Sequence, residues 1–269
     1  MSTGFVKARD GLRIAYEVHG HGSPPLVFVH GWSCDRSYWR NQIGAFASDF
    51  TVVTLDLAGH GESARGREAW TIEGFGGDVA ALVQELGLSK PILIGHSMGG
   101  DVVGAAALQL PERVGGLVWV EVYRQVGTPR TAGQRREFWA PFHADFGNAT
   151  REFVTKMFPP NADRALVKEV AEGMAAAPPE IALPSLEAAF SYDSQIPGAL
   201  RRLGLKVIAI NSAEPPTDVA SMERFGISTR TMPGVGHFPM LEAPGAFNAL
   251  LKTAIVRLRE NREAREPLA

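Results

Sequence analysis

The sequence predicts an α/β protein in which helices cover both faces of a mostly parallel sheet. Short apolar runs alternate with stretches of helical period along the first half of the chain, as in successive βαβ units. Most of these runs are continuously apolar, which is typical of strands buried on both faces. The pentapeptide Gly95-His96-Ser97-Met98-Gly99 lies between one run and a helical stretch, the strand–turn–helix setting in which a G-x-S-x-G sequence is informative.

The elements of the first half follow from these periods in chain order. Residues 12–18 alternate apolar and polar side chains and predict a half-exposed strand. Continuous apolar runs predict four further strands, at residues 25–30, 50–56, 91–94 and 116–121. Helices are predicted at residues 37–46, from the pentapeptide to Leu110, and at residues 71–86, where apolar side chains recur at three- and four-residue steps.

The alternation stops after Tyr123, and the next segment predicts helices alone. From Gly127 to about Leu200, helical patches are separated by prolines and glycines. We therefore expect a helical insertion at residues 125–200 and a core formed by residues 1–124 and 201–269. Strand-like sequence returns in this last part, which predicts strands at residues 205–211 and 228–232 and helices at 217–225 and from Ala243 to about Arg259.

Composition and charge exclude several classes of protein. The 269 residues carry a formal net charge of −2 without a basic block in the body of the chain, so nucleic acid is not an expected partner. No stretch approaches the ~18 continuous apolar residues of a membrane span, and the first residues do not resemble a signal peptide. We therefore expect no membrane partner and a cytoplasmic location. The single cysteine, Cys34, excludes an internal disulfide.

Ser97 is the candidate nucleophile. The glycines around it leave room for a sharp turn that holds the serine in a strained backbone conformation. Such a turn projects the Oγ atom from the top of the sheet, where the free N–H groups and positive dipole end of the following helix face an oxyanion. Because serine is a poor nucleophile at neutral pH, it needs a base to accept its proton.

His237 is the candidate base. Of the seven histidines, it is the one that lies just past the last predicted strand, and in a parallel sheet that loop shares the carboxyl edge with Ser97. Histidine suits the role because its ordinary pKa lies near neutrality. His237 also completes the order serine, acid, histidine along the chain.

Two backbone N–H groups are expected to bind the oxyanion of a tetrahedral intermediate. One belongs to Met98, directly after the candidate nucleophile. The second is assigned to Trp32, in the loop after the strand at residues 25–30, because Gly31 lets the backbone turn its donor inward. The Trp32 indole is also a candidate wall of the substrate pocket, together with Trp139 and Phe142 of the helical insertion.

These segments resemble the α/β-hydrolase fold family, over nearly the whole chain. The matching pieces are His30-Gly31-Trp32, residues 56–63, Gly95-His96-Ser97-Met98-Gly99-Gly100 and Gly236-His237-Phe238. The resemblance implies that the helical insertion is the cap, or lid, of this family, inserted after the sixth strand. It also implies that Asp56 belongs to a loop at the rim of the active site, where we expect a structural role.

The acid that orients the histidine has two candidates. The family commonly places an aspartate after its seventh strand, and here Glu214 falls at the matching step. Some members, such as haloalkane dehalogenases, carry the acid after the sixth strand, where this chain has Glu121. We favour Glu121 because a carboxylate at the tip of a buried apolar strand is unfavourable unless it is paired, and orienting His237 would pair it.

The sequence thus predicts a serine hydrolase that cleaves an ester or lactone of a small, largely apolar substrate through an acyl-enzyme. Dehalogenases and epoxide hydrolases of this fold use an aspartate nucleophile, whereas position 97 is serine. A carbon–carbon bond hydrolase of ring-cleavage products and a hydrolase-like receptor for a small ligand stay open as alternatives. The sequence contains no phosphate loop, dinucleotide fingerprint or Cys/His metal cluster, so no cofactor and no metal are expected.

Overall fold

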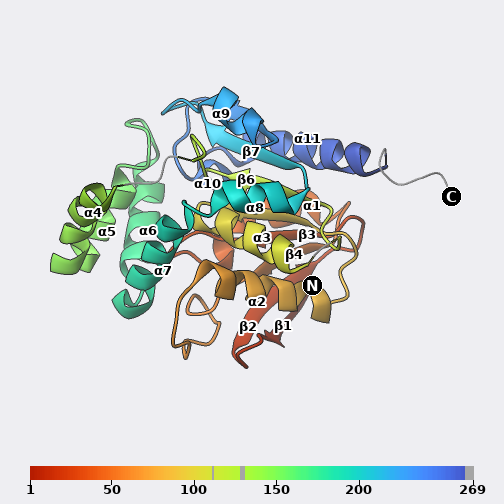
Figure 1. The fold of residues 1–269 in the computed structure, drawn as a ribbon, viewed down its shortest axis with the longest axis horizontal. Coiled ribbons are helices and arrows are strands. Elements are labelled where there is room, and N and C mark those ends of the chain that lie inside the picture. The colour runs from red at the N-terminus through yellow and green to blue at the C-terminus, as the bar shows by residue number, and fades with distance from the viewer. Residues whose placement is uncertain (111, 128–130, 264–269) are drawn as a thin grey trace.

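The computed structural model describes residues 1–110, 112–127 and 131–263, with side chains up to residue 260. The predicted insertion at residues 125–200 and the predicted core at residues 201–269 therefore include residues 128–130 and 264–269, which lie outside this description. The described chain forms a central sheet with helices on both faces and a further group of helices at one end of the molecule (Figure 1).

The sheet confirms the predicted mostly parallel arrangement. Its bounds are β1 Ser2–Lys7, β2 Arg13–His19, β3 Leu26–Val29, β4 Val52–Leu55, β5 Ile92–His96, β6 Gly116–Val120, β7 Val207–Ser212 and β8 Ile227–Met232. The strands lie in the order β1-β2-β4-β3-β5-β6-β7-β8, with β2 antiparallel to both of its neighbours and the remaining pairs parallel. The apolar pattern does not predict β1, because Val6 is its one buried side chain.

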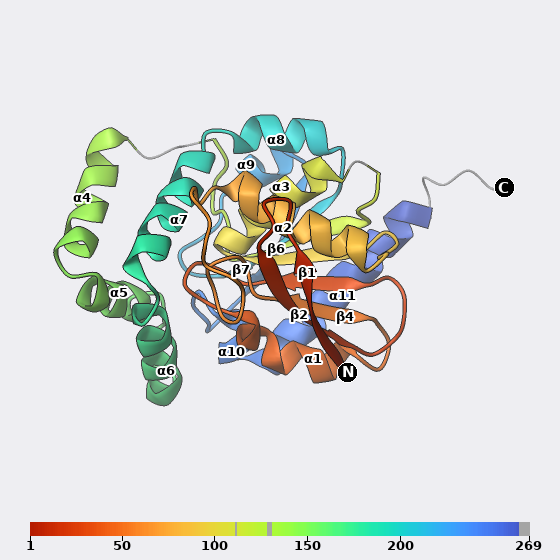
Figure 2. The same cartoon turned by 90° about the horizontal axis from the view of Figure 1, so that it is seen from below.

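Helices pack on both faces of this sheet. Their bounds are α1 Arg40–Phe46 after a 3-10 turn at Arg36–Trp39, α2 Ile72–Glu85, α3 Met98–Gln109, α4 Ala132–Ala144, α5 Phe146–Thr155, α6 Arg164–Ala175, α7 Pro179–Tyr192, α8 Ile196–Leu203, α9 Val219–Arg224, α10 Pro239–Glu242 and α11 Pro244–Glu263. Figure 2 shows α2, α3 and α8 on one face and α1 and α11 on the other. The helices predicted on each side of the pentapeptide are confirmed as α2 and α3.

Between β6 and β7, the residues that the structure describes form helices and no strand, as the sequence predicts. Helices α4 to α7 form the group at one end of the molecule, where α5 packs on α4 and α6 (Figure 2). Helix α8 packs on α3 of the core, which α7 also contacts, and the predicted boundary at residue 200 falls inside α8.

The central strands of the sheet are buried along their whole length. This holds for β3, β4, β5 and β6, as their continuous apolar runs predict. Trp39 packs on Phe28 of β3 and on Phe247 of α11, with ring centroids 5.0 and 6.4 Å apart. Burial of each large apolar side chain of this kind contributes about 1.5–3 kcal/mol to the free energy of folding. This packing gives the loops that follow β3, β5, β6 and β8 a rigid base.

Candidate active site

Ser97 occupies the turn between β5 and α3 in a strained backbone conformation. Its φ is +52° and its ψ is −123°, a region that residues with a side chain rarely adopt. A Cβ atom at Gly95 would collide with the carbonyl oxygen of Gly99, and one at Gly99 would collide with that of His30, so both glycines are required. The Ser97 N–H donates to Val120 O at 2.9 Å, which ties the turn to β6.

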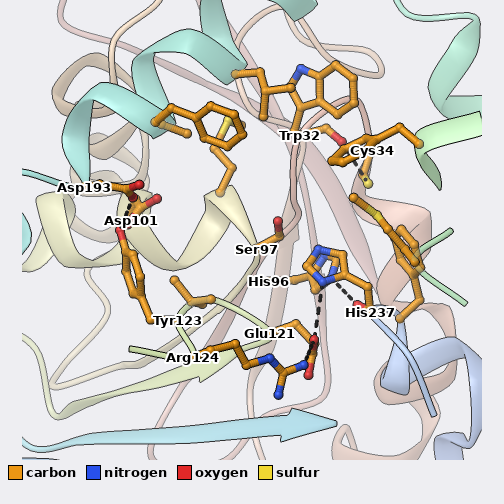
Figure 3. A pocket seen from close by; sticks show the side chains of 18 of the residues that line it. Trp32, Cys34, His96, Ser97, Asp101, Glu121, Tyr123, Arg124, Asp193 and His237 are labelled. Carbon is orange, nitrogen blue, oxygen red and sulfur yellow. Dashed lines mark hydrogen bonds and ion pairs between the residues drawn. The ribbon is translucent and has the colours of Figure 1, made fainter. Parts of the chain in front are cut away.

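The loop after β8 carries His237 to the same cavity as Ser97. Both residues line this cavity, and in Figure 3 the Ser97 hydroxyl and the His237 imidazole face the same space. His96 Nε2 donates to His237 O at 2.7 Å, so the residue before Ser97 holds the backbone of His237. Burial lowers the pKa of His96 well below its ordinary value, which keeps this ring neutral.

Two further contacts hold the His237 loop. The Glu242 carboxylate of α10 accepts from the N–H groups of Gly236 and Phe238, each at 2.9 Å, and burial raises the pKa of this carboxyl. From the other side, the His237 N–H donates to Met157 O at 3.0 Å. The loop is therefore fixed both to the core and to the segment after α5.

Glu121 is the carboxylate that meets His237. It directly follows β6 with a φ of +57°, and its side chain is 3% exposed. Its Oε1 accepts from the Ser212 N–H, and its Oε2 lies 3.4 Å from His237 Nδ1. Glu214, the other sequence candidate, is exposed; its backbone carbonyl rather than its carboxylate joins this network, accepting from Ser212 Oγ at 2.9 Å.

Arg124 is a further member of this group that sequence reasoning missed. Its Nη2 donates to Glu121 Oε2 at 2.7 Å, the oxygen that also faces His237 (Figure 3). Arg124 lines the same cavity as Ser97. The signal that the sequence offers for it is a basic residue three positions after a buried acid.

The Gly31–Trp32 peptide is held from behind by His30. The Gly31 carbonyl accepts from His30 Nδ1 at 2.8 Å and from the Cys34 N–H at 3.3 Å. His30 Nε2 accepts from the Leu57 N–H at 3.0 Å, which leaves the ring proton on Nδ1, and burial lowers the pKa of His30 to about 4. Because a trans peptide carries its N–H opposite its carbonyl, the Trp32 N–H faces away from His30.

The cavity beside Ser97 has a volume of about 500 Å³. Its apolar wall combines Trp32 of the core with side chains from the helical segment, namely Phe153, Met157, Met174, Leu186 and Phe190. Trp32 Nε1 donates to Ala182 O of α7 at 2.6 Å, which fixes the indole against that helix. The side chains of the helical segment thus shape much of the space in front of Ser97.

Trp139 and Phe142, which the sequence predicts as substrate-binding residues, are not among the described residues that line this cavity. Both are buried and pack one layer away from it. Phe142 contacts Trp32 and Phe153, and Trp139 contacts Phe190, with ring centroids 5.6–6.1 Å apart. The aromatic side chains of α4 thus pack against the side chains that line the cavity, on the side away from the cavity.

The cavity also has a second polar group, formed by Asp101, Tyr123 and Asp193 (Figure 3). The Tyr123 hydroxyl donates to Asp101 Oδ1 at 2.6 Å and lies 3.2 Å from Asp193 Oδ1. Burial raises the pKa of Asp101, and that of Tyr123, well above their ordinary values. The sequence signal for this group is an aspartate in the first turn of an otherwise small and apolar helix.

The described residues contain no group of three or more His, Cys, Asp or Glu side chains arranged to hold a metal ion. Across the same part of the chain, no helix combines the length and the apolar character that a bilayer crossing requires.

Comparisons with known sequences relate this chain to several enzymes. A family model described as alpha/beta hydrolase fold matches residues 24–162. The chain is 27% identical to the dihydrolipoyllysine-residue acetyltransferase component of the acetoin cleaving system of Cupriavidus necator, over 90% of this chain and 66% of that protein. It is 35% identical to epoxide hydrolase 4 of Mus musculus, over 41% of this chain and 32% of that protein. The chain thus spans at most about two thirds of the length of these relatives.

Solved structures match the fold over nearly the whole chain. An esterase from Exiguobacterium antarcticum has a TM-score of 0.83 at 19% identity, covering 94% of this chain and 99% of that one. A protein described as an N-acyl homoserine lactone degrading enzyme has a TM-score of 0.78 at 25% identity, covering 93% of this chain and 99% of that one.

Proposed function

The chain belongs to the alpha/beta hydrolase fold family, and on that basis we propose that it is a serine hydrolase cleaving an ester or lactone of a small, largely apolar substrate. The observation that carries the proposal is the position of Ser97. It stands at φ +52° before the first turn of α3, in a cavity that His237 and Glu121 also line.

Proton transfer in this proposal runs between Ser97 and His237. The Ser97 Oγ attacks the substrate carbonyl carbon as His237 Nε2 accepts its proton. Nε2 takes this role because Nδ1 faces Glu121 Oε2 at 3.4 Å. His237 then passes the proton to the leaving alcohol and activates the water that hydrolyses the acyl-enzyme, which restores Ser97.

The negative charge of the tetrahedral intermediate is bound by two backbone donors in this proposal. The Met98 N–H belongs to the first turn of α3, where helical N–H groups lack partners within the helix. The Trp32 N–H is the second, since its peptide is turned by the hydrogen bonds to Gly31 O. A donor of this kind contributes about 2.7–4 kcal/mol to the stability of the transition state.

The shape and lining of the cavity support a small substrate with an apolar part. The volume of about 500 Å³ and the wall of Phe153, Phe190 and methionines suit an acyl chain or an aromatic ring. The 25% identity to the N-acyl homoserine lactone degrading enzyme supports a lactone as the substrate in this proposal. Serine at position 97 argues for acyl transfer, because a serine hydroxyl takes up the acyl group as an ester that water then hydrolyses.

A panel of p-nitrophenyl esters and lactones of graded acyl length tests the proposal, with Ser97→Ala as the blank. We expect multiple turnovers of at least one short ester or lactone, and a loss of about 10³-fold or more in kcat in Ser97→Ala. Turnover that stops near one equivalent would favour a receptor, and equal activity of Ser97→Ala would refute the role of Ser97.

A further inference from the structure

We infer that Arg124 is a positioning residue for Glu121 and His237: it fixes the Glu121 carboxylate and limits how strongly that carboxylate holds a proton on the imidazole. The inference rests on the proposed function, in which Glu121 orients His237. Its structural basis is a single shared atom. Glu121 Oε2 accepts from Arg124 Nη2 at 2.7 Å and lies 3.4 Å from His237 Nδ1.

The guanidinium is itself held rigidly by the end of β7. Arg124 Nη1 donates to Ser212 O at 2.6 Å, and Nη2 donates to Ser212 Oγ, also at 2.6 Å. The Arg124 carbonyl accepts from the Asp218 N–H at 2.8 Å. Because Ser212 also donates its backbone N–H to Glu121 Oε1, one residue of β7 fixes both the arginine and the carboxylate. The Ser212 N–H at Oε1, with Arg124 Nη2 and His237 Nδ1 at Oε2, leaves the Glu121 carboxylate little freedom to turn.

Several charged or titratable groups of the described structure lie around His237. Glu121 follows β6, His96 ends β5 with its ring centroid 4.9 Å from that of His237, and Glu242 of α10 binds the loop backbone. His96 is kept neutral by burial, and the side chains of Glu121 and Glu242 are the acidic groups of this set. An arginine guanidinium keeps its charge at every working pH, so Arg124 is the permanent cation among these described residues around His237.

Arg124 Nη2 and His237 Nδ1 therefore compete for the same oxygen of Glu121, Oε2. Without Arg124, Glu121 Oε2 is free to approach His237 Nδ1, and an imidazolium next to it is more stable. The residue also keeps the carboxylate in place for orienting the neutral ring. Loss of Arg124 is expected to lower kcat and, at the same time, to move the acid side of the activity profile toward neutral pH.

Kinetics of Arg124→Met and Arg124→Lys test this inference on the full chain. We expect the pH at which kcat/KM falls to half, on the acid side, to rise by about half a pH unit or more in Arg124→Met, with kcat lower by about tenfold. Arg124→Lys keeps the charge and should keep the wild-type midpoint. Arg40→Met is the matched control, because Arg40 pairs with the exposed Glu169, neither residue lines the cavity, and the loss of Arg40 should not move the midpoint. A wild-type midpoint in Arg124→Met overturns the inference.

A second measurement does not depend on turnover. In the Ser97→Ala background, the ring signals of His237 are followed by NMR as pH is lowered, with and without Arg124→Met. A higher titration midpoint in Arg124→Met supports the inference even if the wild type hydrolyses none of the esters, in which case the proposed function alone fails. An unchanged midpoint in a folded Arg124→Met protein refutes the inference even if ester hydrolysis is robust.

Discussion

His96 Nε2 donates a 2.7 Å hydrogen bond to the carbonyl oxygen of His237, across 141 positions of sequence. The residue that precedes the candidate nucleophile therefore holds the backbone of the candidate base. The two ring centroids are 4.9 Å apart, and His96 is almost completely buried. The turn after β5 and the loop after β8 are thus joined directly.

Substitution of His96 should separate these two loops. We expect His96→Ala to lower kcat by about tenfold or more and the free energy of unfolding by about 1–3 kcal/mol, because a partly buried acceptor loses its donor. His96→Gln places an amide N–H near the position of Nε2 and should recover most of the lost kcat. Steady-state kinetics and urea unfolding measure both effects. Equal losses in the two variants would count against a positioning role.

The identity of the acid can be settled by a matched pair of variants. Glu121→Gln removes the charge beside His237 Nδ1 and should lower kcat by about 10²–10⁴-fold, while Glu214→Gln alters an exposed side chain and should leave kcat within about twofold. The measurement is hydrolysis of the best ester from the panel. Nearly full turnover by Glu121→Gln would refute the assignment.

The hydrogen bond from His30 to Gly31 O leads to a prediction about the oxyanion site. His30→Ala frees the peptide that presents the Trp32 N–H, so kcat should fall by about tenfold or more while KM changes little. The binding of a boronic acid, which forms a tetrahedral adduct with an active serine, should weaken in parallel. Wild-type kcat and boronate affinity in the folded variant would contradict this role.

Buried His60 should make the folded protein sensitive to acid. Burial lowers the pKa of His60 to about 3, while its ordinary value is 6.5. Below pH 6.5 the unfolded chain takes up a proton that the folded chain refuses, so this residue's contribution to stability falls as pH falls toward 3. At pH 5 the loss is about 2 kcal/mol relative to pH 8.

His60→Asn measures this loss by difference. An asparagine can still donate to Ala58 O, which His60 Nδ1 contacts at 3.0 Å, but it does not titrate. The free energy of unfolding of the wild type minus that of His60→Asn should be about 2 kcal/mol lower at pH 5 than at pH 8. A difference that is the same at both pH values would show that His60 is not held neutral.

Much of the fold could be predicted because local pattern and tertiary role agree along the core strands. A parallel strand buried on both faces requires a continuous apolar run, and β3 to β6 have one. The turn at Ser97 could be predicted because its backbone conformation requires glycines at fixed offsets. Strand β1 could not, since an exposed edge strand needs few apolar side chains.

The lining of the cavity was beyond prediction because it depends on which face each helix of the insertion presents. Trp139 and Phe142 are as aromatic as Phe153 and Phe190, yet only the latter two reach the cavity in the described structure. Likewise, the meeting of Arg124 with Glu121 depends on how Ser212 at the end of β7 fixes both side chains. Such relations arise from packing between segments that are distant in sequence.

Direct detection of the acyl-enzyme tests the central claim most closely. The protein is mixed with p-nitrophenyl acetate, quenched in acid during turnover, digested and examined by mass spectrometry. We predict one acetyl group on the peptide that contains Ser97, absent from the Ser97→Ala protein treated in the same way. Acetylation of a different residue as the turnover intermediate, or ester hydrolysis by Ser97→Ala at the wild-type rate, would contradict the account.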